Sequence, residues 1–134
     1  MRMATRVYEL TGSFNNIQTD THLIFPNVQT CVAVVGASGG VLVGVHATIG
    51  DKARMRGIGE RIARRCPGTP VIYVVGPVSG YNLMPLVDYA SGVRFYETPQ
   101  FIDVEAKLEN GALSFGTGPV GADAFTDIPL CDFS

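Results

Sequence analysis

The sequence predicts a single mixed α/β domain over residues 1–134, in which a β-sandwich or a layered, mostly antiparallel sheet is flanked by two helices. Three observations predict this fold class. Short runs of β-branched residues alternate with turn residues, two segments show a helical spacing of apolar residues, and a length of 134 residues fits one domain. Hydrophobic residues make up 46% of the chain and charged residues 16%, which is typical of a compact globular protein.

Short apolar runs bounded by turn residues predict individual strands at residues 7–10, 22–25, 71–75 and 93–97. The run at 71–75 is continuously apolar, which favours a strand buried on both faces. The polar stretch at 11–21 indicates a loop, and Pro26 with Asn27 indicates a turn.

Two segments are predicted to be helical. The first is capped by Asp51 and runs to about Arg65, before Pro67 and Gly68 end it. Its apolar face is formed by Met55, Ile58 and Ile62. We expect a second, shorter helix at 82–90, despite Pro85.

A second hairpin and a surface tail follow. Asn110 and Gly111 form a strong turn signal between alternating strands at 102–108 and 112–115. The glycine- and proline-rich tail from residue 116 onward is expected to wrap over the surface.

The first hairpin carries the residues of greatest chemical interest, Cys31 and His46. Apolar runs at 32–35 and 41–45 flank a Ser-Gly-Gly turn that can supply positive φ. A symmetric turn centred between residues 38 and 39 would place Cys31 opposite His46, with Cβ atoms about 4.5–5.5 Å apart. A one-residue shift of register would move a side chain to the other face of the sheet.

A thiol beside an imidazole has a clear chemical use. An adjacent imidazolium lowers the pKa of a cysteine and produces an ion-pair nucleophile. The same imidazole can protonate a leaving amine or activate water. The alternative for Cys31 is that its side chain packs as a small hydrophobic group.

The remaining cysteines and histidines argue against other kinds of site. Cys31, Cys66 and Cys131 make an odd number without a CxxC pair, so neither a disulfide framework nor a cysteine-based zinc site is expected. His22 and His46 are the only histidines, and no HxH or HExxH spacing occurs. We therefore expect no metal.

Basic residues are concentrated in the first predicted helix. Six of the ten Lys and Arg residues lie within residues 52–65. Such a helix can dock an acidic protein partner, or it can be a solvated helix face. No aromatic residues are interleaved with the arginines, so nucleic-acid binding is not expected. No apolar run approaches the roughly 20 residues of a membrane span, and residues 1–6 lack a signal-peptide core. We expect a soluble protein made in the cytoplasm, without membrane partners.

The segment from residue 29 to 46 resembles the active-site segment of the glutamine deamidases of the cytotoxic-necrotizing-factor type, and is similar to that of the bacterial chemoreceptor deamidases. In this chain, a cysteine opens a strand of small and β-branched residues, a glycine-flanked turn follows, and Gly44-Val45-His46 closes the segment, and this is the pattern that carries the resemblance. The resemblance implies that Cys31 is the nucleophile and His46 the base, that backbone N–H groups near Cys31 hold the oxyanion, and that no cofactor takes part. The implied partner is a protein that carries a target glutamine.

The chain departs from these families at two places. Val28-Gln29-Thr30 precedes the cysteine where Leu-Ser-Gly or Leu-Gly-Ser is common, and Phe25 stands where the chemoreceptor enzymes have a threonine. The group that orients His46 is left open between Thr21, Gln29 and a backbone carbonyl in the same region of the chain, since a backbone carbonyl is the orienting group in the toxin branch.

The resulting hypothesis is a single deamidase-like domain that hydrolyses protein glutamine through a thioester. It would be a bacterial effector or toxin passed into a target cell by a non-classical secretion system, or a housekeeping enzyme. The alternatives are another Cys-His acyl-transfer enzyme, transglutaminase-like or acting on small amides, and a non-catalytic protein-binding module that docks through the basic helix. The sequence does not predict the oligomeric state.

Overall fold

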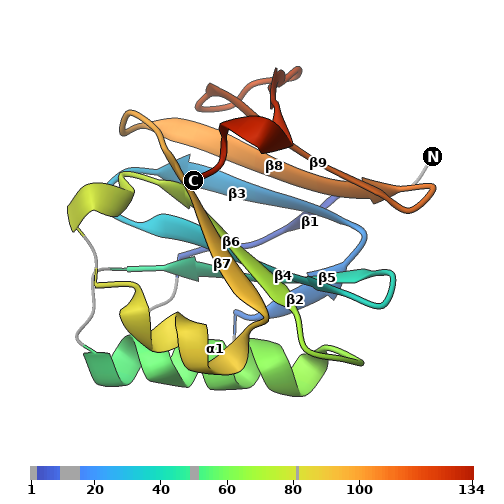
Figure 1. Ribbon diagram of the computed structural model, residues 1–134. Helices are drawn as coiled ribbons and strands as arrows, with labels where there is room; N and C mark the ends of the chain where they lie inside the picture. Colours follow the sequence, from blue (N-terminus) through green and yellow to red (C-terminus); the bar gives the residue numbers. More distant parts are fainter. Residues whose placement is uncertain (1–2, 10–15, 49–51, 81) are drawn as a thin grey trace.

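Two five-stranded sheets pack face to face, and helix α1 (Lys52–Arg65) covers the outer face of one of them (Figure 1). The computed structural model describes residues 3–9, 16–48, 52–80 and 82–134. This architecture confirms the mixed α/β, layered class predicted from the sequence. The predicted helix cap Asp51 lies outside the described residues.

The strands of each sheet come from separate parts of the chain. The first sheet contains, in spatial order, β1 (Thr5–Arg6), β3 (His22–Val28), β8 (Ile102–Glu109), β9 (Ala112–Pro119) and β10 (Thr126–Ile128). The second contains β2 (Gln18–Asp20), β5 (Val41–Ala47), β4 (Val32–Ser38), β6 (Val71–Gly76) and β7 (Gly92–Glu97). Neighbouring strands are antiparallel except for the pairs β1–β3 and β6–β7, which are parallel.

The central hairpin β4–β5 has a two-residue turn at Gly39 and Gly40, whose φ angles of 57° and 84° suit a tight hairpin. Ala33, and not Cys31, therefore lies opposite His46. The register differs by two residues from the one expected, because the turn residues are the two glycines. A two-residue difference keeps every side chain on its face, so Cys31 is a diagonal neighbour of His46.

Strands β4 and β5 are buried on both faces, which explains their continuous apolar runs. One set of side chains points between the two sheets and joins a core cluster that includes Phe25 and Phe115. The alternate set packs against α1 through Met55, Ile58 and Ile62, as predicted. The second sheet, to which the hairpin belongs, is thus the middle layer of the domain, between the first sheet and α1.

Gly44 of β5 allows the two sheets to approach closely beside His46. A Cβ atom at this position would lie 2.7 Å from Leu23 Cδ1 and 2.8 Å from Phe25 Cζ, closer than such atoms can approach. The absence of a side chain at Gly44 therefore brings the apolar side chains of β3 against the hairpin.

The N-terminal segment differs from the predicted strand at 7–10. Strand pairing occurs at Thr5 and Arg6, which pair with β3, and the N–H of Val7 donates to Ile24 O at 2.8 Å. Glu9 then forms a parallel bridge with His46 of the second sheet. The segment 3–9 therefore passes from one sheet to the other.

Two further segments that were predicted as a loop and a turn are strands. The predicted loop at 11–21 contains β2, which pairs with the edge of β5. Strand β3 continues through Pro26 to Val28, because a bulge between Phe25 and Val28 accommodates Asn27 at a φ of 57°.

The segment predicted as a helix at 82–90 is a 3₁₀ helix, η2 (Met84–Tyr89). Pro85 has no N–H to donate, and the N–H of Leu86 bonds the carbonyl of Leu83 three residues earlier, at 3.1 Å. Buried Leu86 packs this short helix into the apolar cluster beside α1.

The predicted second hairpin is confirmed at the Asn110-Gly111 turn, but β9 extends to Pro119. The tail was predicted to wrap over the surface, and instead it adds β10 and the 3₁₀ helix η3 (Leu130–Asp132). Ile128 and Phe133 of the tail are buried in the core. Its glycines and prolines do not prevent burial of these two apolar side chains.

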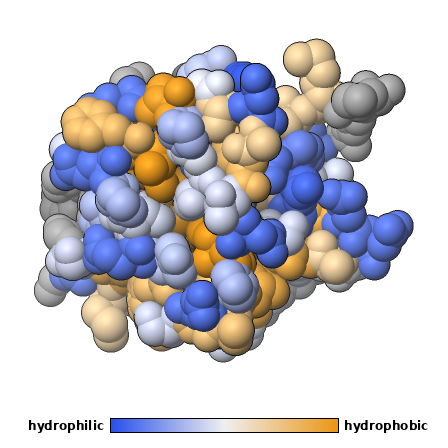
Figure 2. Space-filling view, turned by 90° about the horizontal axis from the view of Figure 1, so that it is seen from above, coloured by the Kyte–Doolittle hydropathy of each residue, from blue (hydrophilic) through white to orange (hydrophobic). Residues whose placement is uncertain are grey.

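The outer face of the first sheet is more polar than its inner face, which carries core residues. On this side, hydrophilic residues are interspersed with small hydrophobic areas (Figure 2). Glu105 Oε2 lies 2.8 Å from His22 Nε2, and Lys107 Nζ lies 3.2 Å from Glu109 Oε1. These charged residues alternate along β8 with core residues such as Val104 and Ala106.

Candidate active site

Cys31 and His46 are in direct contact, as expected from the hairpin that the sequence predicts. The Cys31 Sγ and His46 Nε2 atoms are 2.8 Å apart. Cys31 immediately precedes β4, and His46 lies near the end of β5. Both side chains are almost completely buried between the sheets, with exposed fractions of 2% and 1%.

A third group, the backbone carbonyl of Val7, orients the imidazole. His46 Nδ1 lies 2.9 Å from this oxygen. A carbonyl oxygen only accepts hydrogen bonds, so Nδ1 carries the proton and Nε2 has a free lone pair. The thiol of Cys31 therefore donates to Nε2. These three groups, Cys31, His46 and the Val7 carbonyl, form a chain of two hydrogen bonds, which we call the relay.

Thr21 does not lie beside the pair. Its N–H donates to Asp20 Oδ1 at 2.7 Å and its carbonyl accepts the N–H of Leu108 at 2.7 Å. Asp20 lies opposite Leu42, four residues before His46 on β5, which corresponds to about 13 Å along a strand. The structure therefore does not bring Thr21 to the relay.

Gln29 contributes its main chain and not a bond to His46. Its N–H donates to Cys31 Sγ at 3.4 Å. A backbone carbonyl does contact the imidazole, but it belongs to Val7 and not to the region of Thr21 and Gln29 where it was expected. Val7 itself was missed, because a carbonyl is present at every position and gives no side-chain signal; only its place in a predicted strand indicated ordered backbone there.

The loop from Asn27 to Cys31 surrounds the sulfur with main-chain groups. The Asn27 carbonyl lies 4.0 Å from Sγ, and the N–H of Phe101 fixes the loop by donating to Val28 O at 2.8 Å. Gly76 packs against the other side, where a Cβ atom would lie 3.1 Å from the Cys31 carbonyl oxygen. With a φ of 147°, this position favours glycine.

Burial raises the pKa of the Cys31 thiol, and the charge of Glu9 raises it further. The N–H groups of Gln29 and Cys31 act in the opposite direction, because hydrogen bonds favour the thiolate. Desolvation is the largest of these effects. The net direction for Cys31 is therefore opposite to the lowered thiol pKa that the sequence led us to expect.

Burial also lowers the pKa of His46. The hydrogen bond to Val7 O and the negative charges of Glu9 and Asp103 raise it, but desolvation is the largest effect. A lowered imidazole pKa and a raised thiol pKa both favour the uncharged forms. The resting pair is a neutral thiol donating to a neutral imidazole.

These pKa directions predict how stability depends on pH. Below pH 6.5, the ordinary pKa of histidine, the unfolded chain binds a proton that folded His46 resists, so the free energy of unfolding falls as the pH falls. Above pH 9.0, the unfolded thiol loses a proton that folded Cys31 retains, so the free energy of unfolding falls as the pH rises. Urea denaturation of the wild type and of Cys31→Ala measures this. The variant is expected to lose part of the alkaline decrease only, and an identical alkaline slope in both proteins would contradict the shift.

The other two cysteines are not part of the relay. All three cysteines are free. Cys66, at the end of α1, is half-buried, and desolvation raises its pKa. Cys131 is exposed on η3. Both provide matched controls for substitutions of Cys31.

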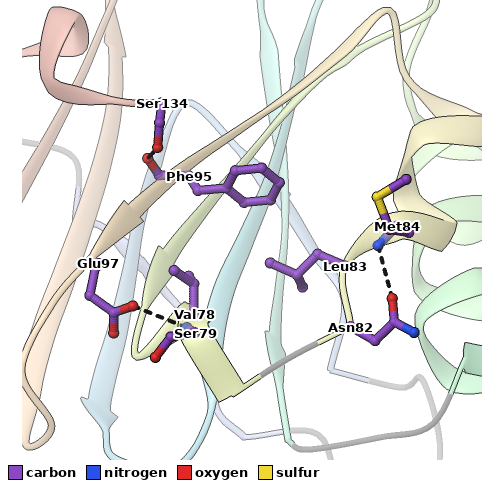
Figure 3. Close-up of a pocket in the computed structure, with 8 residues that line it drawn as sticks. All are labelled: Val78, Ser79, Asn82, Leu83, Met84, Phe95, Glu97 and Ser134. Carbon is purple, nitrogen blue, oxygen red and sulfur yellow. Dashed lines mark hydrogen bonds between the residues drawn. The ribbon is translucent and has the colours of Figure 1, made fainter.

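A separate cavity of about 490 Å³ lies beyond the ends of β6 and β7. Leu83 and Phe95 point toward one another across it, and the N–H of Ser79 donates to Glu97 Oε1 at 3.0 Å (Figure 3). Neither Cys31 nor His46 lines this cavity. Four of its eight lining residues are apolar, and the other four are Ser79, Asn82, Glu97 and Ser134.

The basic helix predicted from the sequence is α1. Arg64 forms an ion pair with Glu60, and Arg65 Nη1 donates to the carbonyl of Arg61 at 3.3 Å. Within the described residues, no cluster of three or more His, Cys, Asp or Glu side chains has the arrangement of a metal site. No helix in the described ranges is long and apolar enough to span a membrane.

Comparisons with protein-family models, with curated proteins and with solved structures found no match to this chain.

Proposed function

We propose that this protein is a cysteine-dependent protein glutamine deamidase, which hydrolyses the side-chain amide of glutamine through a thioester. The observation that carries the proposal is the relay in which Cys31 Sγ lies 2.8 Å from His46 Nε2 and His46 Nδ1 lies 2.9 Å from Val7 O. It places a nucleophile, a base and an orienting group in the order that acyl transfer needs.

The neutral resting pair supports a general-base mechanism. His46 Nε2 takes the thiol proton as Sγ attacks the carboxamide carbon, and a tetrahedral oxyanion forms. The imidazolium then returns the proton to the amide nitrogen, ammonia leaves, and a thioester remains. Water attacks the thioester with His46 again as the base, which releases the glutamate side chain and restores the thiol.

The main chain near the sulfur supports stabilisation of the oxyanion. The N–H groups of Gln29 and Cys31 both stabilise negative charge at Sγ. Donors in this position are near the atom that becomes negative when the carbonyl carbon is attacked. The carbonyl of Val7 holds the Nδ1 proton throughout and stabilises the imidazolium.

Burial favours a side-chain amide over a main-chain peptide bond as the substrate. Only 2% of Cys31 is exposed, which argues against an extended polypeptide main chain reaching the sulfur. Glutamine carries its carboxamide at the end of an unbranched stem, which suits a narrow approach. The backbone carbonyl on His46 also matches the orienting group of the toxin branch of the deamidases that residues 29–46 resemble.

The resemblance also supports a role as a bacterial effector or toxin. In this proposal the enzyme is soluble and acts on a protein in the cytoplasm, either of the producing cell or of a target cell reached by a non-classical secretion system. No cofactor, nucleic acid or membrane takes part.

The proposal is tested by comparing glutamine-to-glutamate conversion across a cell lysate treated with the wild type, with Cys31→Ala or with Cys66→Ala. Conversion sites are expected with the wild type and Cys66→Ala and not with Cys31→Ala, because the Cys31 thiol contacts the His46 imidazole. Mass spectrometry of the digested lysate identifies these sites. An equal set of sites with Cys31→Ala, or none with the wild type, overturns the proposal.

The same experiment separates the two alternatives. A transglutaminase-like enzyme would use the same relay but join an added amine to glutamine, so an amine probe in the lysate would be incorporated. The second candidate is a non-catalytic module that docks an acidic protein through α1, which carries five arginines and one glutamate. Such a module would retain its partner whether or not Cys31 is substituted.

A further inference from the structure

Asp103 is a buried carboxylate that forms no ion pair with a basic side chain within the described residues. Only 3% of the residue is exposed, although it lies on the outer face of β8. Its Oδ1 accepts the N–H of Asn27 at 2.8 Å, and its Oδ2 accepts the N–H of Gly121 at 3.0 Å. Burial of a carboxylate is costly unless hydrogen bonds compensate, so these two bonds account for its tolerance in the fold.

The two bonds connect β8 to two different loops. Asn27 lies in the bulge of β3 at a φ of 57°, a conformation that costs free energy in a residue other than glycine. Asp103 therefore stabilises this strained position. Gly121 belongs to the turn after β9, and its bond closes that turn over the carboxylate.

The loop that Asp103 fixes is the one that leads into Cys31. Three residues lie between Asn27 and Cys31, and the Asn27 carbonyl lies 4.0 Å from Sγ. The N–H of Gln29, two residues further along this loop, donates to the same sulfur. The position of the oxyanion donors therefore depends on the position of Asn27.

The charge of Asp103 also acts on His46. Two charged groups act on this imidazole, Glu9 from the N-terminal segment and Asp103 from β8, and the Cys31 thiol is in contact with it. During the proposed reaction His46 becomes positively charged. A fixed buried anion favours that state over the neutral one.

We propose that Asp103 is a positioning residue for the deamidation reaction, which anchors the Asn27–Cys31 loop so that its N–H groups face the oxyanion and which stabilises the protonated form of His46. This inference rests on the proposed function. It assigns a role to a buried charge that the relay itself does not use.

The test compares Asp103→Asn with Glu105→Gln. Asparagine keeps the shape of the side chain but has a single acceptor oxygen, so one of the two N–H bonds and the charge are lost. Glu105 lies on the same strand and the same face but bonds His22, so Glu105→Gln is a matched control. The readouts are kcat and KM on a converted protein, and the pH at which His46 titrates by NMR.

Asp103→Asn is expected to lower kcat by about 10- to 100-fold, the cost of a small misplacement of catalytic groups. KM is expected to stay within a few-fold, and His46 is expected to titrate at a lower pH than in the wild type. Glu105→Gln is expected to leave kcat and the His46 titration unchanged. A kcat for Asp103→Asn equal to that of the control, or an unchanged His46 titration, overturns the inference.

Two further measurements keep the outcomes distinct. If Asp103→Asn does not fold, Asp103→Glu keeps the charge but displaces the carboxylate, and it is expected to lower kcat with less change in the His46 titration. Failure of the proposed function appears as absence of Cys31-dependent conversion by the wild type. In that case a shifted His46 titration in Asp103→Asn still supports positioning of the pair, and an unshifted one overturns it.

Discussion

Replacing His46 with alanine is expected to lower the rate of glutamine conversion by about 10³-fold, the contribution typical of a general base that also serves as general acid. The substitution removes the acceptor of the Cys31 thiol proton and leaves the Val7 carbonyl without its donor. Because burial raises the thiol pKa, formation of the thiolate is less favourable without a base to take the proton. The rate of conversion of an identified glutamine site measures the effect.

The control for this substitution is His22→Ala. His22 is the other histidine of the chain, and it bonds Glu105 on the outer face of the first sheet, whereas Cys31 and His46 lie between the sheets. Its replacement is expected to leave the rate within a few-fold of the wild type. Equal rates for the two variants, at equal folded fractions, would contradict a role of His46 in the reaction.

Replacing Phe25 with alanine is expected to lower the free energy of unfolding by about 3–5 kcal/mol, the usual cost of removing a buried aromatic ring. Phe25 is fully buried between the sheets, and its ring lies edge-on to the His46 imidazole with centroids 6.2 Å apart. No side chain at Gly44 can fill the space that it leaves. Urea denaturation monitored by circular dichroism measures the loss.

Phe101→Ala is the matched control for this prediction. Phe101 is 60% exposed, so its removal is expected to change stability by less than about 1 kcal/mol. A loss of similar size in both variants would contradict the assignment of Phe25 to the centre of the core. Because Phe25 also contacts the imidazole edge, its variant is expected to reduce activity as well.

Much of the hairpin was predictable because its pattern is local. The β-branched runs and the glycines specify two strands and a turn, and both Cys31 and His46 therefore fall on one face. The register was two residues off because Ser38 pairs with Val41 instead of lying in the turn. Since strand side chains alternate with a period of two, this error preserved the contact.

The rest of the site depends on tertiary structure and could not be predicted locally. The Val7 carbonyl reaches His46 only because a segment far away in the sequence crosses between the sheets. The pKa directions follow from burial, which the residue types alone do not specify. Asp103 gave no signal either, since an aspartate within an alternating strand is typical of a solvent-facing position.

The segment that crosses between the sheets gives the relay an unusual dependence. Because the third partner is a peptide carbonyl, every amino acid at position 7 supplies it, and substitution of that side chain does not delete it. What the relay requires instead is the course of the segment 3–9, which is held by the pairing of Thr5 and Arg6 with β3, by the bond from Val7 N–H to Ile24 O and by the bridge from Glu9 to His46. In the proposed enzyme, local unfolding of this segment would remove the acceptor of the His46 Nδ1 proton.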